Sequence, residues 1–201
     1  MADTASRNVL TEAVWPVEGA GLWVKRAVLV VIGILALAIA AKIKVPAWPS
    51  PVAISLGTFA VLTIGAAYGP RLGLATILGY MALGAAGWDV FQSSSAEASG
   101  ITYMMGSTGG YLVGYVLAVL ALGFAARRGW DRSVAGMAGA MLIGTVLIYI
   151  PGVLWLGQLY GWDQPILAWG VTPFLVGDAL KLALAALVVP GLWKLVGDAR
   201  T

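Results

Sequence analysis

The chain has 201 residues, 60% hydrophobic and 10% charged, with a formal net charge of +3 and a mean hydropathy of +0.90. A water-soluble domain of this length would need far more charge, and a charge this small and scattered excludes nucleic acid as a partner. The chain has no cysteine and no histidine, which excludes disulfides and the usual nucleophile–histidine pairs and leads us to expect no metal or other cofactor.

The first segment, residues 1–24, contains Asp3, Glu12 and Glu18 and no continuous apolar stretch. It is therefore not a cleavable signal peptide. Two alternatives remain open for it: a short interfacial helix that ends near Pro16, or a frayed tail. A membrane domain is expected over residues 25–201.

The rest of the chain contains several apolar runs, each long enough to cross a hydrocarbon core of about 30 Å. They predict an all-α membrane protein with about six transmembrane helices. The expected spans are 27–41, 52–68, 72–86, 109–126, 133–156 and 174–193. Gly69-Pro70 separates the second span from the third, and Pro151 lies inside the fifth.

The basic residues predict the orientation, since cytoplasmic loops are rich in lysine and arginine. With six spans and both termini inside, nine of the twelve basic residues are inside, two are outside and one, Lys181, is within a span. The inside residues are Arg7, Lys25, Arg26, Arg71, Arg127, Arg128, Arg132, Lys194 and Arg200, and the outside residues are Lys42 and Lys44. We therefore expect both termini in the cytoplasm.

Two charged residues interrupt the sixth span. Asp178 and Lys181 are three residues apart, which places them on one helix face, and each costs about 2.5–3.5 kcal/mol at the centre of a membrane helix. One interpretation is a mutual ion pair that tethers helices. The other is a cavity wall that offers a carboxylate acceptor and an ammonium donor to a ligand with N–H groups and a carbonyl or carboxylate, such as a ureido ring.

Two further patterns consist of small residues. The segment 106–111, Gly-Ser-Thr-Gly-Gly-Tyr, is either a capped helix start, with Ser107 or Thr108 as the cap, or a helix N-terminus whose amides face a polar ligand group. Ala36 and Ala40 form a small-x-x-x-small pattern in the first span, which suits the close approach of another helix, although alanine is abundant here.

Taken together, these motifs resemble the BioY proteins, the biotin-specific substrate-binding S components of energy-coupling-factor transporters. The resemblance covers about residues 42–190. It depends on the order and spacing of Val45-Pro46, Pro49-x-Pro51-Val52, Thr58-Phe59-Ala60-Val61-Leu62, Gly69-Pro70-Arg71-Leu72-Gly73, Tyr80, Leu83-Gly84-Ala85-x-Gly87, Val90-Phe91, the Gly-x-Thr-Gly-Gly-Tyr-Leu segment at 106–112, Pro173-Phe174 and Gly177-Asp178-x-x-Lys181.

The resemblance implies a six-helix S-component bundle with a biotin pocket near the outer surface. Asp178 would accept a ureido N–H, and Lys181 would donate to the ureido carbonyl or to the valeryl carboxylate. The other substrate-binding candidates are Tyr80, Gln92, Thr108, Gly109, Gly110 and Tyr111. Ala36 and Ala40 would contact a transmembrane coupling protein, and two ATPase subunits would supply the energy, because this chain has no phosphate-binding Gly-x-x-x-x-Gly-Lys segment.

The chain departs from the family pattern at two positions: Gly57 replaces the usual glutamine of Leu-Gln-Thr, and Ser107 stands where a proline is usual. A solitary transporter for biotin or another small solute remains the alternative function. An intramembrane aspartyl protease needs two carboxylates that face each other, and it is disfavoured here. The carboxylates that could pair with Asp178 are those of Asp89 and Asp163, and both are in predicted loops. We therefore expect a transporter subunit and not an enzyme.

Overall fold

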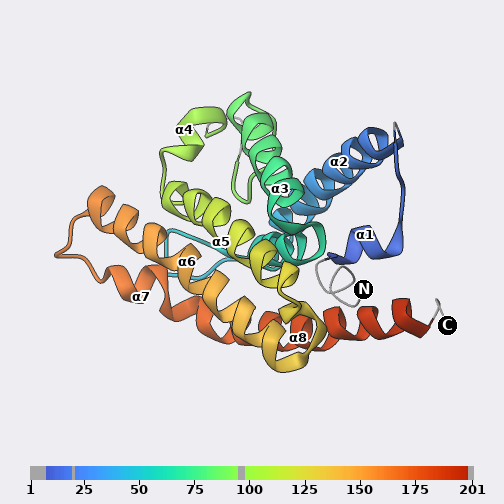
Figure 1. Cartoon of the computed structure of the whole chain (residues 1–201). Coiled ribbons are helices and arrows are strands. Elements are labelled where there is room, and N and C mark those ends of the chain that lie inside the picture. Colours follow the sequence, from blue (N-terminus) through green and yellow to red (C-terminus); the bar gives the residue numbers. More distant parts are fainter. Residues whose placement is uncertain (1–7, 20, 95–97, 199–201) are drawn as a thin grey trace.

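The computed structural model describes residues 8–19, 21–94 and 98–198, and these are mostly helical (Figure 1). Arg7 and Arg200, which the charge analysis places inside, lie outside the described residues. In chain order the elements are α1 (Leu10–Val14), α2 (Gly21–Lys42), β1 (Lys44–Val45), β2 (Ile54–Ser55), α3 (Gly57–Ala85), α4 (Gly100–Met104), α5 (Gly109–Arg127), η2 (Trp130–Arg132), α6 (Val134–Tyr160), α7 (Ile166–Gly170), η3 (Thr172–Phe174) and α8 (Leu175–Asp198).

Within the described ranges, five helical segments are long and apolar enough to cross a membrane. The sequence predicts about six, and the difference lies in α3, which contains most of the second and third predicted spans. The first residues of the second predicted span, 52–56, are not helical and include strand β2. Gly69 interrupts α3 with φ 75° and ψ 176°, a conformation essentially restricted to glycine, and Pro70 follows it. A Cβ atom at Gly73 would be 3.6 Å from the Cα of Gly65, so the chain bends sharply between them. The two limbs of α3 are separate helical pieces, and a count of six membrane crossings stays a prediction.

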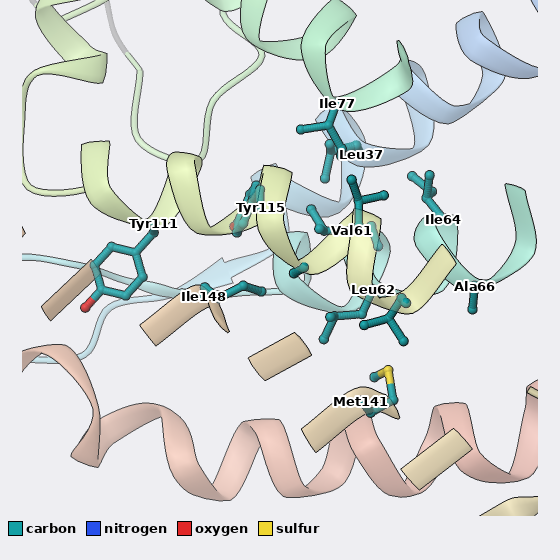
Figure 2. Packing of buried hydrophobic residues seen from close by; sticks show 14 of the residues in the cluster. Leu37, Val61, Leu62, Ile64, Ala66, Ile77, Tyr111, Tyr115, Met141 and Ile148 are labelled. Carbon is teal, nitrogen blue, oxygen red and sulfur yellow. The ribbon is translucent and has the colours of Figure 1, made fainter. Parts of the chain in front are cut away.

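The core of the bundle is α5, which packs between α3 and α6. Small residues allow the backbones to approach closely: a Cβ atom at Gly114 would be 2.6 Å from the Cα of Ile148, and one at Gly123 would be 2.3 Å from the nitrogen of Pro70. Such contacts matter in lipid, where close van der Waals packing drives helix association. Figure 2 shows apolar side chains of α3, α5 and α6 filling the space between these helices, among them Val61, Leu62, Tyr115, Met141 and Ile148.

The outer helices are α2 and the segment 166–197, and only 22% of the most apolar window of each is buried, against 61% for α5. Their exposed side chains are mainly leucine, isoleucine and valine. A continuous apolar surface of this kind would aggregate in water but suits contact with lipid chains. The exposure pattern thus agrees with a membrane protein.

The N-terminal segment contains a docked helix, α1. Val9, Leu10 and Ala13 are buried, and Glu12 binds Arg127 at the end of α5 through two hydrogen bonds of 2.6 and 3.1 Å. The structure has a short helix over residues 10–14, and its place at a membrane interface stays a prediction. Residues 1–7 lie outside the described part of the chain.

A small β-hairpin lies at the opposite end of α2 from α1. Lys44 pairs with Ser55 and Val45 with Ile54 in antiparallel register. The loop between the two strands contains Pro46, Pro49 and Pro51, which cannot donate backbone hydrogen bonds. It turns at residues 47–50, where the Ser50 N–H donates to the Ala47 carbonyl at 2.7 Å. This hairpin and the following start of α3 form one side of the candidate site.

Candidate functional site

A pocket with an empty volume of about 660 Å³, including its open mouth, lies at the hairpin end of the bundle. Its walls come from the hairpin segment, α3, the loop after α3, and the starts of α5 and α8, with part of α6. The lining residues with polar groups are Ser55, Thr58, Tyr80, Gln92, Tyr103, Thr108, Tyr111, Tyr115, Thr145, Tyr149, Asp178 and Lys181.

The charged pair on α8 forms one wall of this pocket. The Lys181 Nζ donates to Asp178 Oδ1 at 3.0 Å, and the two side chains are 10% and 15% exposed. Asp178 is in the first turn of α8, where the positive end of the helix dipole stabilises a carboxylate. The residues thus form an ion pair that lines a cavity, and the binding of a ligand by this pair stays a prediction.

Two residues from other helices hold the pair in place. Lys181 Nζ also donates to Thr58 Oγ1 on α3 at 2.9 Å, and the Tyr149 hydroxyl on α6 donates to Asp178 Oδ2. Each carboxylate oxygen thus has a partner and still has a lone pair, and the ammonium makes two of its three possible hydrogen bonds within the described residues. The remaining capacity can serve a ligand with both N–H donors and a carbonyl.

Sequence reasoning did not name Thr58 or Tyr149 as site residues. Thr58 follows Gly57 in the family motif Leu-Gln-Thr, so the sequence contained a signal that this residue could belong to the site. Tyr149 offered a weaker signal, namely a phenol inside an apolar span, which usually indicates a buried partner for its hydroxyl.

The aromatic side chains form the apolar part of the pocket. Phe91 packs edge-on against Tyr80, with ring centroids 5.3 Å apart, and stacks on Tyr103 at 4.8 Å. The Tyr80 hydroxyl donates to the Val90 carbonyl at 3.1 Å, and the Tyr111 hydroxyl donates to the Gly170 carbonyl at 2.8 Å. Because these two hydroxyls already donate to the backbone, Tyr80 and Tyr111 offer mainly their rings to the cavity.

The loop after α3 contributes Phe91 and Gln92 to the wall of the pocket. Gln92 lines the pocket and donates its side-chain N–H to the Ala53 carbonyl at 2.6 Å. Lys44 Nζ donates to the Gln92 backbone carbonyl at 2.7 Å, and Lys42 forms a 2.5 Å ion pair with Asp89. The hydrogen bond from Lys42 lowers the pKa of the exposed Asp89 carboxyl. These contacts join the two predicted outside lysines to the loop.

Two of the predicted site residues do not line the pocket. A Cβ atom at Gly109 would be 2.2 Å from the Met104 carbonyl oxygen, and one at Gly110 would be 2.2 Å from the Pro151 carbonyl oxygen. These glycines therefore allow α4, α5 and α6 to pack closely. Thr108 does line the pocket and is the N-cap residue of α5, but it makes no side-chain capping hydrogen bond, which corrects the expected cap.

The predicted partner face is on the outer side of α2. Ala36 is exposed, whereas Ala40 is partly buried against the core cluster. Exposed Leu35 and Ile39 flank them. The face is thus accessible at Ala36, and contact with a partner there stays a prediction.

The comparison that decides the family covers nearly the whole described chain: the profile described as the BioY family matches residues 8–198. The chain belongs to the BioY family. This confirms the resemblance inferred from the motifs. A probable biotin transporter BioY from Pyrococcus horikoshii is 34% identical over 164 residues, which cover 82% of this chain and 93% of that protein. A biotin transporter BioY from Thermotoga maritima is 32% identical, over 77% of this chain and 91% of that protein.

The fold also matches that of a solved structure. A crystal structure of the S-component for biotin from an ECF-type ABC transporter superposes with a TM-score of 0.74 at 21% identity, covering 89% of this chain and 95% of the other. This BioY-family chain therefore has the S-component fold. Its curated relatives are transporters and not enzymes. Among the described residues, no group of three or more carboxylate, histidine or cysteine side chains is placed to hold a metal ion.

Proposed function

We propose that this BioY-family chain is the biotin-binding subunit of an energy-coupling-factor transporter in the cell membrane. The single observation that supports this most strongly is the Asp178–Lys181 pair in the wall of an aromatic pocket. The relatives named above are biotin transporters, which indicates the same ligand for this chain.

The chemistry of the pocket suits each part of biotin. The ureido ring has two N–H donors and a carbonyl, which match the Asp178 carboxylate and the Lys181 ammonium. The thiolane ring and valeryl chain are apolar and can pack on Phe91, Phe174 and Tyr111. Lys181 donates to the ureido carbonyl or to the valeryl carboxylate, and both alternatives stay open.

Binding is tested by titrating biotin calorimetrically into the purified chain in detergent. We expect one-to-one binding by the wild type and a large loss of affinity in Asp178→Asn. The matched control is Asp163→Asn, which removes an exposed carboxylate outside the pocket and should leave the affinity unchanged. Absence of biotin binding by folded wild-type protein would refute the proposed ligand.

We also propose that the pocket faces outward and that both termini are cytoplasmic. Lys25, Arg26, Arg71 and Arg127 line one groove and so lie at one end of the bundle, whereas Lys42 contacts the loop beside the pocket. The positive-inside rule then places the groove end in the cytoplasm. This orientation requires an even number of crossings, which is satisfied if each limb of α3 spans the membrane.

The absence of native cysteine permits a direct test of this orientation. Arg128→Cys and Ser94→Cys introduce single thiols at exposed or partly exposed positions at the two ends. A membrane-impermeant maleimide applied to intact cells should label residue 94 and label residue 128 only after lysis. The opposite pattern would reverse the proposed orientation.

ATP-driven transport would require partners, because the chain has no nucleotide-binding motif. In our proposal a transmembrane coupling protein contacts the α2 face at Ala36 and Ala40, and two ATPase subunits supply the energy. Biotin uptake by cells that produce this chain without those partners would instead support the solitary transporter. Biotin binding by the chain and the dependence of uptake on partners are thus tested by separate measurements.

A further inference from the structure

A second hollow lies at the end of the bundle away from the biotin pocket, between α1, α2 and the bend of α3. We call it the basic groove, and define it by Trp23, Lys25, Arg26, Leu29, Arg71 and Arg127, which are among its lining residues. It shares none of its lining residues with the pocket. The proposed biotin site therefore leaves the groove unexplained.

The charges of the groove are predominantly positive. Four basic residues and one carboxylate, Glu12, line it, so its formal charge is +3. Glu12 is bound to Arg127 at 2.6 Å, and Lys25 donates to the backbone carbonyl of Trp15. Arg26 and Arg71 are exposed, and within the described ranges neither forms an ion pair with a carboxylate. Two cationic side chains thus remain available to an anion.

The rest of the groove is apolar. Leu29, Val30 and Ala75 line it farther along α2 and α3, toward the centre of the membrane. Trp23 is 72% exposed beside the charges, and the Arg26 guanidinium lies 5.2 Å from its ring centroid. An exposed tryptophan with basic neighbours at the end of a transmembrane helix is typical of the level of lipid headgroups.

We propose that the basic groove binds an anionic glycerophospholipid. Its phosphate lies against Arg26 and Arg71, because guanidinium groups bind phosphate oxygens through paired hydrogen bonds. One acyl chain lies along Leu29 and Ala75. A free phosphate ion would leave this apolar wall uncovered, and a zwitterionic lipid would bring a cationic headgroup into a groove that is already positive. This inference does not depend on the ligand of the pocket or on the orientation in the membrane.

The test uses the full chain in detergent with added lipid. Native mass spectrometry and thermal unfolding are measured with dioleoylphosphatidylglycerol, with dioleoylphosphatidylcholine and with inorganic phosphate. We expect retained lipid adducts and a raised midpoint of unfolding with phosphatidylglycerol, and neither effect with the other two. An equal effect of phosphatidylcholine, or an equal rise in the midpoint with inorganic phosphate, would overturn the proposal.

A variant locates the site. In Arg26→Gln/Arg71→Gln the affinity for phosphatidylglycerol should fall about 25-fold, since each cation near a membrane surface contributes about fivefold to binding of anionic lipid. The control is Arg128→Gln, an exposed arginine near the same end that does not line the groove. Undiminished phosphatidylglycerol binding by the double variant would refute this site. If that variant does not fold, the comparison of lipids on the wild type still decides the proposal.

Discussion

The ion pair between Asp178 and Lys181 can be separated experimentally into a part that stabilises the fold and a part that binds ligand. The change is a cycle of three variants: Asp178→Asn, Lys181→Met and the double variant. In each single variant, one charge stays in a site where both side chains are at most 15% exposed. Breaking a buried pair in this way costs about 3–5 kcal/mol, whereas replacing both partners with uncharged groups is often neutral.

The structure indicates that each single variant loses stability near the lower end of this range of about 3–5 kcal/mol. The remaining Lys181 ammonium keeps its 2.9 Å hydrogen bond to Thr58, and the remaining Asp178 carboxylate keeps the bond from Tyr149. We expect each single variant to lose about 3 kcal/mol in free energy of unfolding and the double variant to lose less than about 1 kcal/mol. Unfolding in detergent, followed by tryptophan fluorescence, measures this.

Biotin affinity should follow a different pattern. Each hydrogen bond from the ligand to a charged group contributes about 1.5–3 kcal/mol, or about 10- to 150-fold in affinity. All three variants should therefore bind at least about tenfold more weakly, and the double variant should be the weakest although it is stable. A double variant that binds biotin like the wild type would show that the pair only tethers helices, and would refute the assigned role in binding.

Three further predictions concern other parts of the chain. Tyr149→Phe removes the hydroxyl that donates to Asp178 and should weaken biotin binding about tenfold by calorimetry, with a loss of about 1–3 kcal/mol in free energy of unfolding because a buried carboxylate oxygen loses its donor. Ala36→Trp enlarges the exposed face of α2 and should preserve biotin binding but reduce co-purification with the coupling protein. Gly110→Ala places a Cβ atom 2.2 Å from the Pro151 carbonyl oxygen and should lower the midpoint of thermal unfolding by several degrees.

Each of these has a matched control. Tyr160→Phe changes an exposed tyrosine on the same helix as Tyr149, and Ala183→Trp enlarges an exposed position on α8. Gly191→Ala adds a Cβ atom to a helical glycine at a position where it would meet nothing within 4 Å, so this substitution should be neutral or stabilising. Equal affinity in Tyr149→Phe and the wild type, normal co-purification of Ala36→Trp, or an unchanged unfolding midpoint in Gly110→Ala would contradict the corresponding argument.

The class of protein and the charged pair of the site could both be predicted from the sequence. Long apolar runs and the uneven distribution of basic residues can be read directly along the chain, so the membrane class was predictable from the sequence alone. Asp178 and Lys181 were conspicuous for the same reason, because two charges three residues apart within an apolar run require an explanation. Their position in the wall of a pocket agrees with that reasoning.

The arrangement around that pair depended on the tertiary structure. Tyr149 and Thr58 reach Asp178 and Lys181 from two other helices, and such contacts depend on how each helix is rotated and crossed against its neighbours. No local pattern contains that information. The same limit explains Gly110, which suggested a ligand-facing helix start in the sequence and instead packs against α6.

The sequence by itself thus determined that this is a membrane-embedded helical protein of the BioY pattern, with a charged pair in its last span. The break at Gly69-Pro70 was also predictable, but only the tertiary structure decided that the two limbs of α3 pack against each other, and that α1 docks through Glu12 and Arg127. The physical reason is the same in each case. Hydropathy and spacing act along the chain, whereas packing joins residues that are far apart in it.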